Sequence, residues 1–357
     1  MKRITQLLTA VITSISLLSF GAGAASAEEK TEFKLAWSIY VGWMPWGWAA
    51  DQGIVKKWAD KYGIEIEVVQ FNDYIESINQ YTAGAFDGVT ATNMDTLAIP
   101  SVGGVDTTAL IVGDFSNGND ALILKDADQL GAVIGQNVNL VELSVSHYLL
   151  ARALESMGKS EKDVTVVNTS DADMIAAYQT TDVTAVVTWN PLVAEIVETP
   201  GANKVFDSSN IPGEIMDLTV VNTQTLTDNP AFGKALAGAW YETMSIMLSD
   251  TDKGAAARAA MGEASGTDLA GYDMQLASTQ MFAKPEDAVT FTTSKDVAAT
   301  MQSVRTFLFE RGLLGEGAAS PDIVGIAFPD GAVLGDEANV KLRFNADYMS
   351  MAADGTL

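Results

Sequence analysis

The 357-residue chain contains no cysteine and only one histidine, His147. Disulfide bonds, thiolate chemistry and a metal site built from several histidines are therefore excluded. Basic residues are also scarce, because 21 lysines and arginines stand against 46 aspartates and glutamates, and the net charge is -25. Such an acidic protein repels nucleic acid and anionic membranes. The composition predicts a protein that has no cofactor, no metal and no nucleic-acid partner, and that is stabilised by its apolar core.

Long apolar runs are absent too, except near the N-terminus. Lys2 and Arg3 precede an apolar segment that extends to Phe20, and the tripeptide ASA follows at positions 25–27. This pattern is typical of a secretory signal peptide and is too short for a membrane span. We expect residues 1–27 to be removed, so that a periplasmic mature chain begins at Glu28.

The remaining chain alternates short β-type runs with helical patterns. FKLAW (33–37) and IEIEVVQF (64–71) have the composition of strands, and a helical pattern follows each of them. The same alternation returns from Asp120 to Val221, after which the chain is mostly helical. This order predicts an α/β fold in which mainly parallel sheets are flanked by helices.

The length of the chain exceeds that of one usual domain, so we expect two lobes with a cleft between them. The chain contains no low-complexity linker, which favours lobes joined by strand-like crossings. The first lobe is expected to comprise residues 28–118 and 222–357, and the second lobe residues 119–221.

Ligands of open parallel sheets bind beyond the carboxyl ends of the strands, near helix N-termini. The segments that we expect at these places are 38–46, 72–74, 92–95, 113–120, 142–147, 188–191 and 213–218. None of them contains lysine or arginine, whereas together they contain several acidic residues. An anionic ligand would be disfavoured there, so the sequence favours a cation or a neutral solute rich in hydrogen-bond donors. The acidic residues are Asp73, Asp95, Asp114, Asp120, Glu142, Glu214 and Asp217.

The segment SIYVGWMPWGWAA (38–50) concentrates aromatic residues directly after the first expected strand. A flat, weakly hydrated cation stacks on indole faces while its N–H groups require carboxylate partners. We expect Trp43 and Trp46, which lie in the turn itself, to contact such a ligand. Trp37 and Trp48 are expected to pack in the core, as large aromatic residues usually do.

Most other candidates also have a purely structural explanation. Capping of a helix would explain an aspartate at position 95 without any ligand, and solvation of a hinge would explain the aspartate at position 120. Glu142 ends an apolar strand and has no capping duty, and Asp217 interrupts the apolar strand IMDLTVV, so both require a partner. The candidate ligand-binding residues are Trp43, Trp46, Asn93, Asp95, Asp120, Glu142, Ser144, Trp189 and Asp217.

The phrases INQYTAGAFDGVTATNMDTL, SHYLLARALESMG and AVVTWNP occur in this order along the chain. Together they resemble the nitrate/sulfonate/taurine class of ABC-transporter substrate-binding proteins, over essentially the whole mature chain. The run KLAWSIYVGWMPWGWA and the motif TWNP are similar to the branch associated with urea carboxylase. The resemblance implies a two-lobed periplasmic-binding-protein fold of type II and places Trp189 at the cleft.

The resemblance also implies a non-enzymatic monomer that closes over a small solute and delivers it to the permease subunits of an ABC importer. The urea-carboxylase branch implies urea or guanidine as the transported solute. Of these, guanidinium fits the acidic and aromatic candidates best, with urea or a larger guanidino or amide compound as alternatives. An anion binder of the same fold is a further alternative, which the lack of basic residues disfavours. A carboxylate-dependent exported hydrolase is the alternative of a different class, although the sequence has no G-x-S-x-G or H-E-x-x-H motif.

Overall fold

The computed structural model describes residues 30–315 and 317–357, so the expected signal peptide and the expected mature start at Glu28 lie outside the described residues. The segment Thr31–Leu357 forms one compact unit. Among the described residues, no helix combines the length and the apolar character that crossing a bilayer requires.

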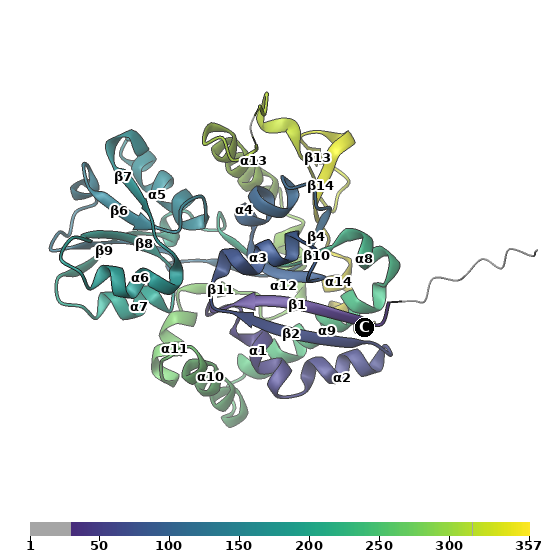
Figure 1. Cartoon of the computed structure of the whole chain (residues 1–357). Coiled ribbons are helices and arrows are strands. Elements are labelled where there is room, and N and C mark those ends of the chain that lie inside the picture. The colour runs from purple at the N-terminus through teal and green to yellow at the C-terminus, as the bar shows by residue number, and fades with distance from the viewer. Residues whose placement is uncertain (1–29, 316) are drawn as a thin grey trace, which may run out of the picture. The chain divides into compact units, whose positions relative to one another are not determined.

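The larger of two sheets has nine strands and occupies the centre and right of Figure 1. Its strands pair in parallel at β2-β1-β3 and β4-β14-β12, whereas β10 is antiparallel to both of its neighbours. In spatial order the strands are β13 (Val333–Leu334), β12 (Gly325–Ala327), β14 (Val340–Phe344), β4 (Thr107–Ser116), β10 (Met216–Asn222), β3 (Gly88–Thr92), β1 (Glu32–Ser38) and β2 (Glu65–Phe71), and β11 (Thr279–Met281) pairs with β4.

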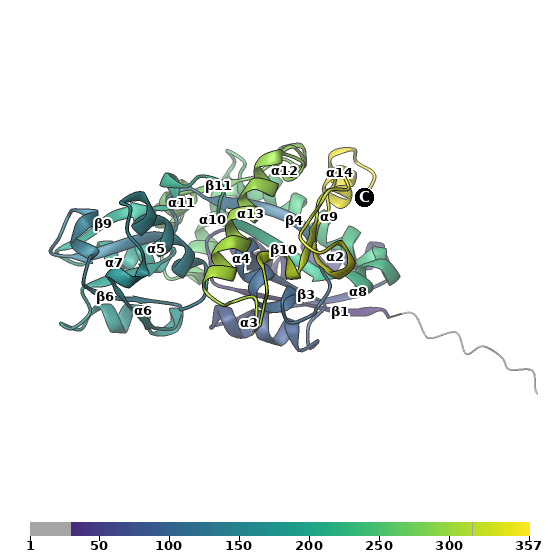
Figure 2. The same cartoon turned by 90° about the horizontal axis from the view of Figure 1, so that it is seen from above.

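The smaller sheet has five strands and lies to the left in Figure 1, separate from the larger sheet also in the perpendicular view of Figure 2. Strands β7, β6 and β8 are parallel, while β5 is antiparallel to β8 and to β9. The spatial order is β7 (Thr165–Asn168), β6 (Asn137–Leu140), β8 (Ala185–Thr188), β5 (Ala121–Lys125) and β9 (Ala202–Asp207).

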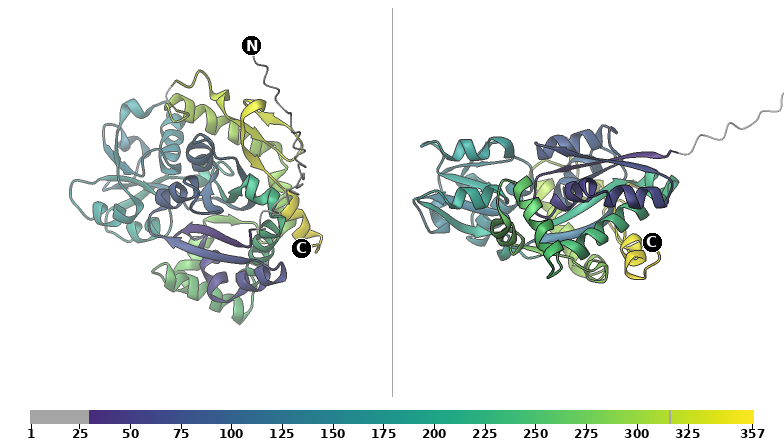
Figure 3. Two further views of the ribbon diagram at one scale, coloured as in Figure 1. Left: turned by 45° about the vertical axis from the view of Figure 1, so that its right-hand side comes forward. Right: turned by 90° about the horizontal axis from the view of Figure 1, so that it is seen from below.

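Helices α5, α6 and α7 pack on the smaller sheet, and these elements form the smaller lobe. The larger lobe comprises the larger sheet and the remaining helices, of which α9 packs against α1, α2, α10 and α14. The C-terminal helix α14 lies on the side of the larger lobe that is far from the smaller sheet (Figure 3). The helices are α1 (Met44–Asp51), α2 (Ile54–Lys61), α3 (Tyr74–Thr82), α4 (Asn93–Thr96), α5 (Val145–Ser156), α6 (Asp171–Tyr178), α7 (Leu192–Val197), α8 (Thr223–Asp228), α9 (Pro230–Met247), α10 (Asp252–Ala264), α11 (Leu269–Leu276), α12 (Pro285–Thr292), α13 (Lys295–Glu310) and α14 (Asp347–Ala353).

The α/β class with two sheets flanked by helices is confirmed, but the sheets are mixed and not mainly parallel as the sequence predicted. The difference arises where the chain returns from the smaller lobe. Met216, at the start of β10, pairs with Phe115, near the end of β4. A strand that begins beside the end of its neighbour must run in the opposite direction, so β10 is antiparallel. The residue limits that we expected for the two lobes remain a prediction.

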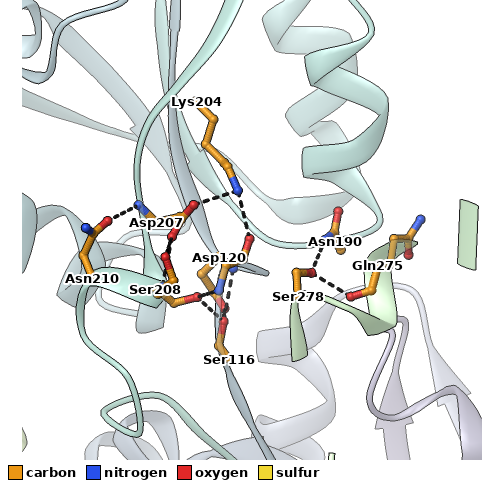
Figure 4. Close-up of polar contacts among 11 residues, drawn as sticks. Ser116, Asp120, Asn190, Lys204, Asp207, Ser208, Asn210, Gln275 and Ser278 are labelled. Carbon is orange, nitrogen blue, oxygen red and sulfur yellow. Dashed lines mark hydrogen bonds and ion pairs between the residues drawn. The ribbon is translucent and has the colours of Figure 1, made fainter. Parts of the chain in front are cut away.

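Two short segments, 117–120 and 208–215, carry the chain between the sheets. Serine side chains tie them together: the hydroxyls of Ser116 and Ser208 are 2.6 Å apart, and the Gly118 N–H donates to Ser208 Oγ at 2.7 Å. The Ser116 hydroxyl also donates to Asp120 Oδ2 at 2.5 Å (Figure 4). These bonds fix the crossing segments directly beside the carboxyl end of β4.

Candidate functional site

A small buried cavity lies between the lobes, next to the crossing segments. It offers only about 10 Å³ to the centre of a water-sized sphere, and no residue that lines it is more than 6% exposed. Side chains of both lobes form its wall. The lining residues are Tyr40, Trp43, Tyr74, Thr92, Asp120, Val145, Trp189, Ile215 and Asp217.

Four aromatic rings form a continuous row along the cavity. The ring centroids of Tyr40 and Trp43 are 4.9 Å apart, those of Trp43 and Tyr74 are 5.5 Å apart, and those of Tyr74 and Trp189 are 5.7 Å apart. Trp189 follows β8 of the smaller lobe, whereas the other three rings belong to the larger lobe. The row therefore spans both lobes, and its indole faces could hold a flat cation.

The turn between β1 and α1 explains why two of these rings meet. The backbone N–H groups of Trp43 and Met44 both donate to Tyr40 O, at 2.9 and 3.0 Å, and Pro45 occupies the first turn of α1. This tight turn brings Tyr40 and Trp43 to the same side of the chain. The indole N–H of Trp43 is buried and has no hydrogen-bond partner within the described part of the protein. A buried donor without a partner carries a free-energy cost that an acceptor on a ligand could remove.

Two carboxylates reach the cavity, and a third lies behind it. Asp217 and Asp120 line the cavity, and Asp114 faces Asp217 directly across the β4–β10 pair. Tyr40 donates its hydroxyl to Asp114 Oδ1 at 2.9 Å. The remaining Oδ2 atoms of Asp114 and Asp217 are buried and have no donor among the described residues.

Burial raises the pKa of each carboxyl group in this region. The pKa of Asp114 rises to about 7, and those of Asp120 and Asp95 to about 6. Burial and the neighbouring charge of Asp114 raise the pKa of Asp217 well above its ordinary value. None of the ion pairs formed between described residues involves these four aspartates. The site thus concentrates negative charge in a desolvated place without a cation of its own.

The described residues contain no group of three or more histidine, cysteine, aspartate or glutamate side chains arranged to hold a metal ion.

Trp43, Asp120, Trp189 and Asp217 are the predicted site residues that the structure brings together at the cavity.

Trp46 lies elsewhere, in the core of the larger lobe. It is fully buried, donates its indole N–H to Thr219 Oγ1 at 3.2 Å, and packs on Trp240 with ring centroids 5.3 Å apart. The prediction that Trp46 lies at the cleft is therefore wrong. Trp37 is buried as predicted, and it packs so tightly on Gly47 that a Cβ there would lie 2.4 Å from its ring.

Asn93 and Ser144 are buried but have structural duties and do not line the cavity. Asn93 accepts from the Met216 N–H at 3.0 Å and donates to Glu214 O at 3.1 Å, which fixes the start of β10. Ser144 caps α5 by accepting from the Ser146 N–H. Neither side chain has a free polar group directed at the cavity.

Glu142 is exposed, contrary to the expectation of a buried carboxylate at a strand end. The strand β6 ends at Leu140, and Glu142 already belongs to the turn before α5. Because water solvates its carboxylate, Glu142 needs no partner, and it does not line the cavity.

Asp95 is fully buried beside the cavity but does not line it. Its Oδ2 accepts from the Tyr74 hydroxyl at 2.7 Å, from Thr92 Oγ1 at 2.9 Å and from the Val145 N–H of the other lobe at 3.4 Å. Asp95 therefore orients Tyr74 and contacts the N-terminus of α5 across the lobes.

The cavity also contains residues that the sequence did not single out: Tyr40, Tyr74, Thr92, Val145 and Ile215. All of them lie in, or directly beside, the segments expected at the carboxyl ends of strands. Tyr40 and Tyr74 could have been found by applying to tyrosine the argument made for tryptophan, because both rings present an apolar face and a polar tip.

The family model described as NMT1-like family matches residues 26–262, which is more than half of the chain. The chain belongs to the NMT1-like family. No curated protein matches this NMT1-like chain in sequence.

Solved structures resemble the NMT1-like chain in fold. The alkanesulfonate-binding protein SsuA from Xanthomonas axonopodis pv. citri matches with a TM-score of 0.66 and 16% identity, covering 81% of this chain and 96% of that protein. The aliphatic sulphonate-binding protein SsuA from Escherichia coli matches with a TM-score of 0.65 and 16% identity, and the match covers 80% of this chain and 94% of that protein. The nitrate-binding protein NrtA from Synechocystis PCC 6803 matches with a TM-score of 0.56 and 13% identity, and the match covers 92% of this chain and 99% of that protein. These matches confirm the periplasmic-binding-protein fold.

Proposed function

We propose that this protein is the extracytoplasmic solute-binding component of an ABC importer and that its solute is a small organic cation, with guanidinium the best candidate. The observation that carries the proposal is the buried cavity, which combines a row of aromatic rings with carboxylates and has no positive side chain to balance them. The fold supports the transport role, since the similar structures include proteins named as sulfonate-binding and nitrate-binding.

The acidic residues around the cavity favour a cationic ligand over sulfonate or nitrate, the anions for which the similar structures are named. Asp120 and Asp217 line the cavity, and Asp114 and Asp95 lie directly behind its wall. A desolvated sulfonate or nitrate at this place would have no cationic partner and would face several carboxyl groups. An anion binder of the same fold is thus the weaker alternative for this chain.

Size and shape favour guanidinium among the cations. The space in the cavity that the centre of a water-sized sphere can reach is only about 10 Å³, so the site has no room for a drug-sized ligand. Guanidinium could place its faces against the rings of Trp43 and Trp189 and direct its N–H groups at Asp120 and Asp217. At about 1.5 kcal/mol per heavy atom, this four-atom ligand would reach a dissociation constant of some tens of micromolar.

Urea has nearly the same shape and similar donors, and it is the main alternative ligand. It is neutral, so it would leave the charge of Asp120 and Asp217 unbalanced. A larger guanidino or amide compound would need more room than the closed cavity offers. A hydrolase is the alternative of another class, and the similarity in fold to proteins named as solute-binding favours a binding role over it.

Delivery of the solute would use the separation of the lobes. Two hydrogen bonds join the lobes in the closed state. The Val145 N–H donates to Asp95 Oδ2, and the Asn190 amide donates to Ser278 Oγ at 3.2 Å, the second of which is drawn in Figure 4. A ligand that adds contacts to both lobes shifts the open–closed equilibrium towards the closed state. We propose that the protein is periplasmic and monomeric and that it presents this closed state to the permease subunits. In this proposal the first lobe comprises residues 28–118 and 222–357, and the second lobe comprises residues 119–221.

A thermal-shift panel tests the proposed function. The mature protein is melted with guanidinium chloride, urea, taurine, sodium nitrate or sodium chloride, each at a few millimolar, where denaturing effects are negligible. Guanidinium chloride should raise the melting temperature relative to sodium chloride, because a ligand that binds only the folded state stabilises it. A rise with taurine or nitrate and none with guanidinium would contradict the proposal.

A further inference from the structure

We propose that the empty site holds one proton between Asp114 and Asp217 and that binding of the cationic solute releases this proton to solvent. The inference rests on the proposed function, which it extends from the identity of the ligand to the chemistry of its binding.

The first argument is the position of the two carboxyl groups. Asp114 and Asp217 are directly opposite in the antiparallel β4–β10 pair, 0% and 3% exposed, in the centre of the larger sheet. Like charges directly opposite each other destabilise a sheet. Gly42 makes room for the pair, because a Cβ at this position would lie 2.5 Å from Asp114 Oδ2.

The second argument is the hydrogen bonding of the two groups. Asp114 Oδ1 accepts from the Tyr40 hydroxyl, but the Oδ2 atoms of Asp114 and Asp217 have no donor from the described residues. Two ionised carboxylates cannot donate to each other. One proton on either group supplies the missing donor to its neighbour, so a shared proton satisfies both oxygens.

Among the described residues, the titratable groups that interact with the pair supply no positive charge. The titratable groups that interact with it come from the β1–α1 turn, the crossing segment and α11, and they are neutral tyrosines or a further carboxyl group: Tyr40, Asp120 and Tyr272. Asp95 interacts in turn with Asp120. None of these groups can balance two negative charges, so a proton is the available counter-charge when the cavity is empty.

A bound cation replaces that counter-charge. Asp217 lines the cavity, so a cation there lies next to the pair and favours its fully ionised form. The exchange is balanced: one monocation enters, one proton leaves, and the charge of the pair with its occupant stays the same. The ligand's N–H groups then supply the donors that the shared proton had supplied.

The exchange predicts how affinity depends on pH. Burial raises the pKa of Asp114 to about 7 and that of Asp217 well above its ordinary value, so the empty pair keeps its shared proton near neutral pH. Affinity for a cation should therefore rise with pH through this range, up to tenfold per pH unit for one released proton. The affinity for urea, which brings no charge, should not rise in this way.

Calorimetric titration with guanidinium chloride in buffers of different ionisation enthalpy counts the released protons. At pH 6.5 we expect about one proton released per guanidinium bound, and fewer as the pH rises through the range in which the empty pair loses its proton. Binding without proton release at pH 6.5 would overturn the exchange and leave the proposed function intact. No binding of guanidinium under any of these conditions would overturn the proposed function and, with it, the exchange.

Two variants identify the source of the proton. Asp114→Asn supplies Asp217 with a permanent amide donor, so guanidinium should bind this variant without proton release and with little dependence on pH. Asp120→Asn removes the other cavity carboxylate and should keep most of the proton release, even though it binds more weakly. Loss of proton release in Asp120→Asn and retention in Asp114→Asn would show that Asp120 is the source and would overturn the assignment to the pair.

Discussion

Trp43 and Trp46 are three positions apart, and their indole N–H groups have different surroundings. That of Trp46 donates to Thr219, whereas that of Trp43 has no partner among the described residues and lies at the cavity. The same local sequence thus provides one residue for the core and one for the site.

Replacement of each tryptophan by phenylalanine should separate these roles. Trp46→Phe leaves the buried Thr219 hydroxyl without its donor and opens space in the core, so the unliganded protein should lose about 1–3 kcal/mol of stability. Trp43→Phe breaks no protein hydrogen bond, so it should lose less stability but at least tenfold in guanidinium affinity. Thermal unfolding and calorimetry measure the two effects, and guanidinium and urea are avoided as denaturants because they are the candidate ligands. A larger stability loss in Trp43→Phe would show that our assignment is reversed.

Asp217 supplies the test of charge at the scale of one residue. Asp217→Asn should weaken guanidinium binding by about ten- to a hundredfold, as expected for one charge-assisted contact of about 1.5–3 kcal/mol, and should weaken urea binding less. Glu142→Gln is the matched control, since it removes one charge from an exposed position and should leave both affinities unchanged. Equal losses for the two ligands in Asp217→Asn would rule out a charge contribution.

At the scale of elements, the crossing segments set the position of the carboxylates. Ser208 Oγ accepts from the buried Gly118 N–H and contacts the Ser116 hydroxyl, which in turn donates to Asp120. The hydroxyls thereby fix the junction of the two sheets next to the cavity.

Ser208→Ala should remove the acceptor of the Gly118 N–H and cost about 1–3 kcal/mol of stability. Ser209→Ala, at the neighbouring exposed position, should cost much less because its hydroxyl bonds only to Asp207, which keeps its ion pair with Lys204. Thermal melts of the two variants make the comparison, and equal melting temperatures would show that the crossing segments do not depend on this serine.

Local patterns predicted the strands better than their pairing. The runs 33–37 and 64–71 were predicted as strands and form β1 and β2. The direction of β10 depends on where the chain returns beside β4. This is a contact between segments that are distant in sequence, and the periodicity of a local pattern gives no information about it. The site divides in the same way: Trp43 and Asp217 were predicted from their local setting, whereas the exposure of Glu142 depends on where β6 ends.

At the scale of the whole molecule, several buried acids make the stability of the empty protein depend on pH. Burial raises the pKa of Asp95, Asp114, Asp120, Asp171 and Asp217 above the ordinary value of 3.8. Between about pH 4 and 7 the folded protein therefore binds more protons than the unfolded chain, in which these groups are ionised. The sign follows: stability is greatest towards the acidic end of this range and falls as pH rises through it.

The unliganded protein should accordingly melt at a lower temperature at pH 8 than at pH 5.5, and Asp217→Asn should reduce the difference. Saturating guanidinium should reduce it too, because the cation stabilises the ionised form that the higher pH produces. Melting curves over this range measure the effect. A melting temperature that rises steadily from pH 5.5 to pH 8 without ligand would contradict the raised pKa values.

The central claim is that a buried aromatic and acidic cavity selects a small cation. Calorimetric titration of the wild-type mature protein at pH 8 with guanidinium, urea, taurine and nitrate tests it most directly. We predict that guanidinium binds with a dissociation constant of some tens of micromolar or lower, that urea binds at least tenfold more weakly, and that the two anions give no binding heat. Tighter binding of taurine or nitrate than of guanidinium would contradict the claim.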